Sequence, residues 1–176
     1  TANIGGGMMS VNSNSSFNEV TINENTADMG GGGISLASSN STFTHVVFSG
    51  NTALEGGGGG ISSANSDLSF NDVTINENTA DMGGGIFEIN SNSTFTHMTI
   101  NENTALQGGG VFSADSDLSF NDVTINENTA DGGAGLLIIN CNPIMNDVNI
   151  IGNNSINPGG GVLLAESDPI LTNSII

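Results

Sequence analysis

The sequence contains no lysine and no arginine, although it has 18 aspartates and glutamates among 176 residues. Proteins that bind the phosphate backbone of nucleic acids neutralise it with these basic side chains, and docking on anionic membrane surfaces depends on them too. The composition therefore excludes nucleic acid and anionic membranes as partners. It also excludes every ion pair between a carboxylate and a lysine or arginine.

Long apolar runs are missing as well. No stretch approaches the roughly 18 apolar residues of a membrane span, and no charged segment leads into an apolar run as in a signal peptide. We expect no membrane insertion, and any export signal has been removed or lies outside this segment. The single cysteine, Cys141, cannot form an intrachain disulfide, so cysteine usage gives no redox compartment. The apolar fraction of 36% is nevertheless too high for a disordered acidic tail.

The sequence is rich in glycine, with 26 residues, and much of it follows a repeated Asn-Thr-Ala phrase. Successive copies of the phrase are 25 to 27 residues apart, which divides the chain into seven similar units of about 25 residues. The two longer units have extra glycine, at Gly30 to Gly33 and at Gly56 to Gly60. Insertions confined to one point of a repeat indicate a corner loop. The threonines that mark the units are Thr1, Thr26, Thr52, Thr79, Thr104 and Thr129, with a degenerate copy at Asn154.

Within a unit, apolar and small polar residues alternate with the period of a β-strand. In the segment 69–76, Phe70 and Val73 differ in parity, so we expect the chain to turn near Asn71-Asp72. Aligned units place like residues in columns, as in a parallel β-solenoid whose coils stack about 4.8 Å apart. The main columns are Phe17, Phe43, Phe70, Phe95, Phe120, Met145, Leu171; Ile22, Phe48, Ile75, Ile100, Ile125, Ile150, Ile176; and Met8, Ile34, Ile61, Ile86, Val111, Leu136, Val162.

A helical alternative is poor, because no unit has an apolar stripe at helical spacing. A 25-residue coil with short strands at the Gly, Phe and Val-x-Ile segments predicts three faces. One asparagine per coil, followed two residues later by alanine, predicts an asparagine ladder at a corner with the small alanines inside the turn. The asparagines are Asn25, Asn51, Asn78, Asn103, Asn128 and Asn153.

Two short motifs, Gly83-Gly84-Gly85-Ile86 and Phe48-Ser49-Gly50-Asn51, resemble the repeats of polymorphic outer-membrane proteins and related right-handed parallel β-helix proteins of bacterial surfaces and secretions. The resemblance extends over essentially all 176 residues, although Ile75-Asn76-Glu77-Asn78 has isoleucine in place of the motif phenylalanine. It implies an all-β, right-handed, three-faced parallel β-helix. It also implies an exported adhesive or structural protein at the cell surface or outside the cell.

An enzyme is not expected. Pectate-lyase-like β-helices use an arginine base, which this chain lacks. A glycosidase would need two carboxylates about 5 to 10 Å apart, and an active site would interrupt the repeat once, whereas the acidic pattern recurs in every coil. A carbohydrate-binding or carbohydrate-cleaving β-helix remains the alternative to a structural role.

Stacked carboxylates suggest a calcium site, because Ca²⁺ prefers oxygen ligands. The alternative is a solvated acidic ridge that salt screens. The candidate ligands are Glu24, Glu77, Glu102 and Glu127 of one column, interrupted by Ser49, with Asp28, Glu55, Asp81 and Asp131 near the glycine corner.

The two histidines occupy another column, in which each lies between carboxylates of the neighbouring coils. A metal or catalytic cluster is one interpretation, and relief of repulsion between the carboxylates is the preferred one. This column comprises Glu19, His45, Asp72, His97, Asp122 and Asp147.

Candidate glycosylation sites of the form Asn-x-Ser/Thr occur at Asn14, Asn40, Asn92 and Asn153, and the first three share one column. Cys141 takes the place of serine in another column and is expected to be a small stacked side chain rather than a nucleophile.

No polar cap is visible at either end of the repeat, although solenoids need capping units to cover their open edges. The first unit begins in register at Thr1, and the last runs into Ile175-Ile176. We therefore expect either flanking repeats of the same chain or end-to-end self-association. Glycans or cell-surface ligands are further possible partners.

Overall fold

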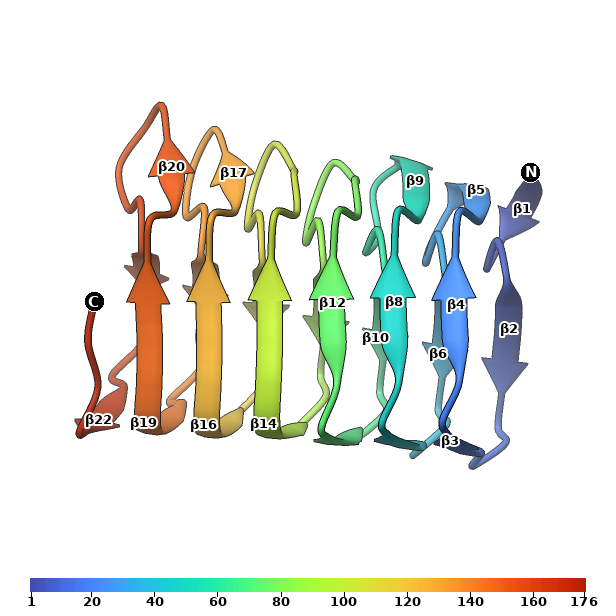
Figure 1. The fold of residues 1–176 in the computed structure, drawn as a ribbon, viewed down its shortest axis with the longest axis horizontal. Coiled ribbons are helices and arrows are strands. Elements are labelled where there is room, and N and C mark those ends of the chain that lie inside the picture. The colour runs from blue at the N-terminus through green and yellow to red at the C-terminus, as the bar shows by residue number, and fades with distance from the viewer.

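The computed structural model describes all residues from 1 to 176 and contains strands, turns and bends but no helix. Accordingly, no helix that could cross a membrane is present. The coils are stacked along the longest axis of the molecule, and the N- and C-termini lie at opposite ends of the stack (Figure 1). Strands of neighbouring coils pair in parallel, so the predicted parallel β-solenoid of about seven turns is confirmed.

The first face is a seven-stranded sheet formed by the segments that follow the glycines, and its strand order is the order of the chain. Inward and outward residues alternate along the strands; in the segment 86–89, for example, Ile86 and Glu88 are buried and their neighbours are half-buried. The strands are β2 (Met8–Val11), β6 (Ile34–Ala37), β10 (Ile61–Ala64), β13 (Ile86–Ile89), β15 (Val111–Ala114), β18 (Leu136–Ile139) and β21 (Val162–Ala165).

The second face is a ten-stranded sheet that contains both the Phe segments and the Val-x-Ile segments. The backbone has a positive φ at the residue between the two segments, for example 54° at Asp72 and 50° at His97, which confirms the predicted turn near Asn71-Asp72. The strands are β3 (Ser16–Asn18), β4 (Thr21–Asn23), β7 (Thr42–Thr44), β8 (Val47–Ser49), β11 (Ser69–Asn71), β12 (Thr74–Asn76), β14 (Thr94–Asn101), β16 (Ser119–Asn126), β19 (Ile144–Ile151) and β22 (Ile170–Thr172).

The third face is formed by the Thr-Ala segments, along the top edge of the stack in Figure 1. Three faces are therefore present, but they are grouped differently from the expectation. A single left-handed residue bends the chain between the Phe and Val-x-Ile segments without ending their sheet. The strands of the third face are β1 (Ala2–Ile4), β5 (Thr26–Met29), β9 (Thr52–Glu55), β17 (Thr129–Ala130) and β20 (Asn154–Ser155), joined by isolated bridges between Thr52, Thr79, Thr104 and Thr129.

The interior consists of the predicted apolar columns, and the pairing register confirms them. Phe70, for example, lies opposite Phe43 in one neighbouring coil and Phe95 in the other. The rings stack with centroids 4.6 to 5.2 Å apart and planes 4° to 12° from parallel. Phe43, Phe70 and Phe95 are thus each covered on both faces by phenylalanine rings of the neighbouring coils, which removes a large apolar area from water.

The asparagine ladder is confirmed as well. The amide nitrogen of Asn78 donates to Oδ1 of Asn103 at 3.0 Å, and Asn103 donates in the same way to Asn128 at 3.0 Å. The second amide proton bonds a backbone carbonyl, as from Asn103 to Ile75 at 2.9 Å. The interior polar corner is therefore fully hydrogen-bonded, with buried alanines such as Ala105 beside it.

Candidate functional site

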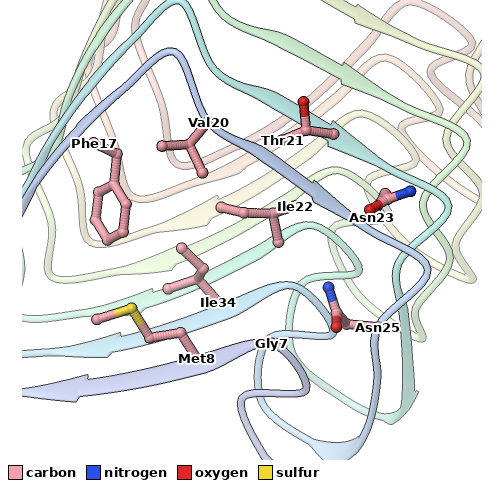
Figure 2. A pocket seen from close by; sticks show the side chains of 9 residues that line it. All are labelled: Gly7, Met8, Phe17, Val20, Thr21, Ile22, Asn23, Asn25 and Ile34. Atoms are coloured by element: carbon pink, nitrogen blue, oxygen red, sulfur yellow. The ribbon is translucent and has the colours of Figure 1, made fainter.

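The first of two cavities lies at the open N-terminal end of the solenoid and has a volume of about 400 Å³. Side chains of the first coil point into it, as Figure 2 shows for Phe17, Val20 and Ile22. No residue that lines it is titratable. The lining residues are Gly7, Met8, Phe17, Val20, Thr21, Ile22, Asn23, Asn25 and Ile34.

Both ends of the stack expose the core columns. Met8 is 36% exposed, whereas Ile34, its partner in the second coil, is 1% exposed. At the opposite end, Leu171 and Ile176 are 43% and 64% exposed although they continue the Phe and Ile columns. The two end surfaces are thus the same apolar cross-section seen from opposite sides.

The second cavity, of about 490 Å³, lies on the outside of the stack near the C-terminal coils. Its only titratable residue is Asp131. The lining residues are Leu106, Gln107, Asp131, Gly132, Asn157, Pro158 and Leu163.

The predicted glutamate column is present, with one correction. Ser49 pairs with Asn23 and Asn76, one position before the glutamates, so Gly50 rather than Ser49 interrupts the column. The glutamates Glu24, Glu77, Glu102 and Glu127 are all exposed and have φ angles between 55° and 58°. They therefore lie on an outer corner, with their side chains in solvent.

The aspartates near the glycine corner are separated from one another by apolar residues. Ala27 pairs with Ala53 and Met29 with Glu55, which places Asp28 opposite Leu54. The bridges at Thr79 and Met82 to the next coil likewise place Asp81 opposite Leu106. The full column reads Asp28, Leu54, Asp81, Leu106, Asp131 and Ile156, so successive aspartates are two coils apart.

No three histidine, cysteine, aspartate or glutamate side chains form a group that could hold a metal ion. The structure thus places the expected calcium ligands on two corners, Glu24, Glu77, Glu102 and Glu127 on one and Asp28 and Asp81 on the other, without bringing them into one cluster.

The histidine column has the predicted arrangement. His45 Nε2 lies 3.5 Å from Asp72 Oδ2, and His97 lies between Asp72 and Asp122 at 3.9 and 3.8 Å. All four side chains are about half exposed. This geometry fits an alternation in which each histidine lowers the repulsion between the carboxylates of neighbouring coils. Exposed pairs of this kind contribute little to stability.

The structure separates the four candidate glycosylation sites into two classes. Asn14, Asn40 and Asn92 are exposed. In each of them Oδ1 accepts a backbone N–H of a neighbouring coil at 2.8 to 2.9 Å, which leaves the amide nitrogen facing solvent. Asn153 instead belongs to the interior ladder, and its amide nitrogen donates to the carbonyl of Ile125 at 2.9 Å.

Cys141 is fully buried, and the backbone N–H of Ser116 donates to its sulfur at 3.1 Å. It therefore occupies the place that the serine hydroxyl takes in other coils, as the column predicted.

Glu88, the one fully buried carboxyl group, is not among the residues predicted from the sequence. It points inward from β13 and pairs with Ser63 and Ser113 of the adjacent coils. Ser93 Oγ donates to its Oε1 at 2.6 Å, and its Oε2 has no partner. Burial raises the pKa of Glu88 from 4.5 to about 8, with a further increase from Asp67 and an opposing effect of the Ser93 hydrogen bond. The alternation Ile86-x-Glu88 was the signal that could have placed it inside.

The model of the right-handed β-helix region matches residues 7–176. The chain therefore belongs to the right-handed β-helix family, and the solenoid described above is its fold. No curated protein and no solved structure matches the chain.

Proposed function

We propose that this protein is an extracellular structural or adhesive β-solenoid that forms part of a stalk or filament. The single observation that carries the proposal is the exposure of the core columns at both ends of the stack. Met8 and Leu171 are large apolar side chains in positions that are buried in the middle coils. Another coil, from flanking repeats of the same chain or from a second copy, would cover them.

The two ends are suited to each other because every coil already pairs with the next in the same direction. β21 pairs in parallel with β18, and the free edge of β2 has the same polarity as β18. A second copy placed head to tail would therefore continue the sheets and bury Met8 and Ile22 against the apolar residues of the last coil. The formal charge of −18 opposes lateral association and leaves axial stacking as the less repulsive route.

Export to the cell surface is supported by the resemblance of the Gly83-Gly84-Gly85-Ile86 motif to polymorphic outer-membrane protein repeats. A non-enzymatic role is supported by the residues that line the two cavities. The first has no titratable residue and the second has only Asp131, whereas glycoside cleavage needs a pair of carboxylates.

Sedimentation velocity and electron microscopy of the 176-residue chain over a range of concentrations test the stacking. Met8→Asp places a charge in the open end, and Met9→Asp places the same charge on the outward face of the same strand as a matched control. We expect axial oligomers of the wild type and of Met9→Asp, and monomers of Met8→Asp. A wild-type chain that stays monomeric at high concentration and moderate salt would count against stacking between copies.

A further inference from the structure

The second cavity lies over a small apolar layer on the outside of the seven-stranded sheet. Phe112 and Leu137 face outward by the alternation of their strands, yet they are only 7% and 5% exposed. The reason is that the glycine-corner loops cross directly above them. A Cβ at Gly108 would lie 2.9 Å from Phe112 Cβ, and one at Gly133 would lie 2.9 Å from Leu137 Cβ, so only glycine permits this approach.

Leu163 continues this outward column into the last coil, where it is only half-buried and lines the cavity. Leu106, on a loop tip, lines it too and is 54% exposed. The result is a groove with apolar side chains that no other part of the chain covers.

Asp131 gives the groove its charge. Its backbone carbonyl accepts hydrogen bonds from the Asn157 N–H at 2.7 Å and the Ser155 hydroxyl at 3.0 Å, which fix the loop. No hydrogen bond or ion pair within the chain involves its carboxylate, and the chain contains no lysine or arginine. An unpaired carboxylate therefore lies beside exposed apolar carbon.

We propose that this groove binds a lysine or arginine side chain of a partner polypeptide. Such side chains combine a long apolar stem with a terminal cation, so the stem would lie on Leu106 and Leu163 while the cation meets Asp131. A second copy of this chain cannot supply the cation, because it has no lysine or arginine. The partner is therefore a different protein that exposes a lysine or arginine side chain, and the inference is independent of the axial stacking proposed above.

The other aspartates of the same column lack this combination. Asp81 has phenylalanines in the corresponding outward positions, Phe87 and Phe112, but its Oδ2 accepts a hydrogen bond from the Gly56 N–H at 3.1 Å. Near Asp28, the outward positions that correspond to Leu137 and Leu163 are occupied by Ser35 and Ser62. These serines provide no apolar surface beneath the carboxylate. Asp28 is exposed like Asp131 and has the same place in its loop. It is therefore a matched control for an effect of charge alone.

The test uses an uncharged Gly-Ser peptide that contains a single lysine, and the same peptide with acetyl-lysine, titrated into the isotopically labelled chain and followed by NMR. We expect the lysine peptide to shift the Leu106 and Leu163 methyl signals and the Gly132 amide signal. The acetyl-lysine peptide, which keeps the stem but lacks the charge, should bind about three- to fivefold more weakly.

Asp131→Asn should weaken binding of the lysine peptide by the same factor, and Asp28→Asn should leave it unchanged. Leu106→Ser should also weaken binding, which diffuse attraction to an acidic surface would not do. The proposal is overturned by signal shifts spread evenly over the acidic columns, by equal binding of both peptides, or by equal effects of the two aspartate variants.

Discussion

Ser93 Oγ lies 2.6 Å from Glu88 Oε1 inside the solenoid, and the second carboxyl oxygen of Glu88 has no partner. One hydrogen bond does not replace the hydration that an ionised carboxylate loses on burial, so the protonated form is favoured. With a pKa of about 8, Glu88 is mostly neutral in the folded protein near pH 7 and mostly ionised in the unfolded chain.

This difference predicts that the contribution of Glu88 to stability is present below pH 4.5 and is lost as the pH rises to about 8. In that window the folded state binds more protons than the unfolded state, so each increase in pH favours unfolding. The change from 4.5 to about 8 corresponds to roughly 5 kcal/mol of unfolding free energy. Urea unfolding of the wild type and of Glu88→Gln at several pH values measures it.

The Glu88→Gln variant should lack this decline, so that its stability relative to the wild type increases between pH 4.5 and 8. Glu77→Gln, on the exposed corner, is the control and should follow the wild type. Parallel pH profiles for the wild type and Glu88→Gln would contradict the assignment of a buried, protonated carboxyl group.

The extent to which the sequence predicted these features depends on whether a column repeats one residue type. Phe70 and Asn103 belong to columns of like residues, and the structure has them in the expected register. Glu88 belongs to a column that also contains Leu36 and Ser63, so no likeness marked it as interior.

The repeat pattern does not predict which residues are neighbours at the loop tips either, because Asp28 and Leu54 have opposite chemistry although they lie side by side in adjacent coils. Residue type alone groups the aspartates together, and only the pairing register shows that they alternate with apolar residues. The groove beside Asp131 depends in addition on loops that cross the outside of a sheet, and no repeat pattern encodes how a glycine loop folds over its neighbour.

Truncation of a stacked phenylalanine should be costly. Phe95 is fully buried between Phe70 and Phe120, with ring centroids 5.2 and 4.6 Å away. Phe95→Ala should lower the unfolding free energy by about 3 to 5 kcal/mol, because the stack prevents the cavity from closing. Thr99→Ala, at an outward position of the same strand, should cost less than about 0.5 kcal/mol. Similar losses in chemical denaturation would mean that inside and outside are misassigned.

The asparagine ladder predicts a comparable loss from a polar side chain. Asn103 accepts hydrogen bonds from the backbone and side chain of Asn78 and donates to Ile75 and Asn128. Asn103→Ala leaves these buried groups unpaired and should cost about 2 to 4 kcal/mol. Asn101→Ala, two residues earlier and in contact with solvent, should be nearly neutral in the same thermal and urea measurements. An equally mild Asn103→Ala variant would show that the ladder contributes little.

Glycan attachment should follow the two classes of asparagine. In a secretory host that modifies Asn-x-Ser/Thr, we expect glycans at one or more of Asn14, Asn40 and Asn92, because their amide nitrogens face solvent. Asn153 should be unmodified, because its amide nitrogen donates inside the ladder. Trypsin has no cleavage site in a chain without lysine and arginine. Mass spectrometry of peptides from a glutamate-specific protease therefore maps the glycosylated positions. Occupancy at Asn153 alone, or at none of the four, would contradict this accessibility argument.

The acidic corners predict a response to salt rather than to one particular ion. Glu77, Glu102 and Glu127 occupy successive coils and repel one another, and no lysine or arginine offsets the repulsion. Since no cluster of three ligands forms, added NaCl should raise the melting temperature by screening, and a chelator at constant ionic strength should leave it unchanged. Differential scanning calorimetry with NaCl, CaCl₂ and EDTA at matched ionic strength compares the two effects. A melting temperature that falls with EDTA and that NaCl does not restore would instead indicate a calcium site, because an ion that binds the folded state alone stabilises it by mass action.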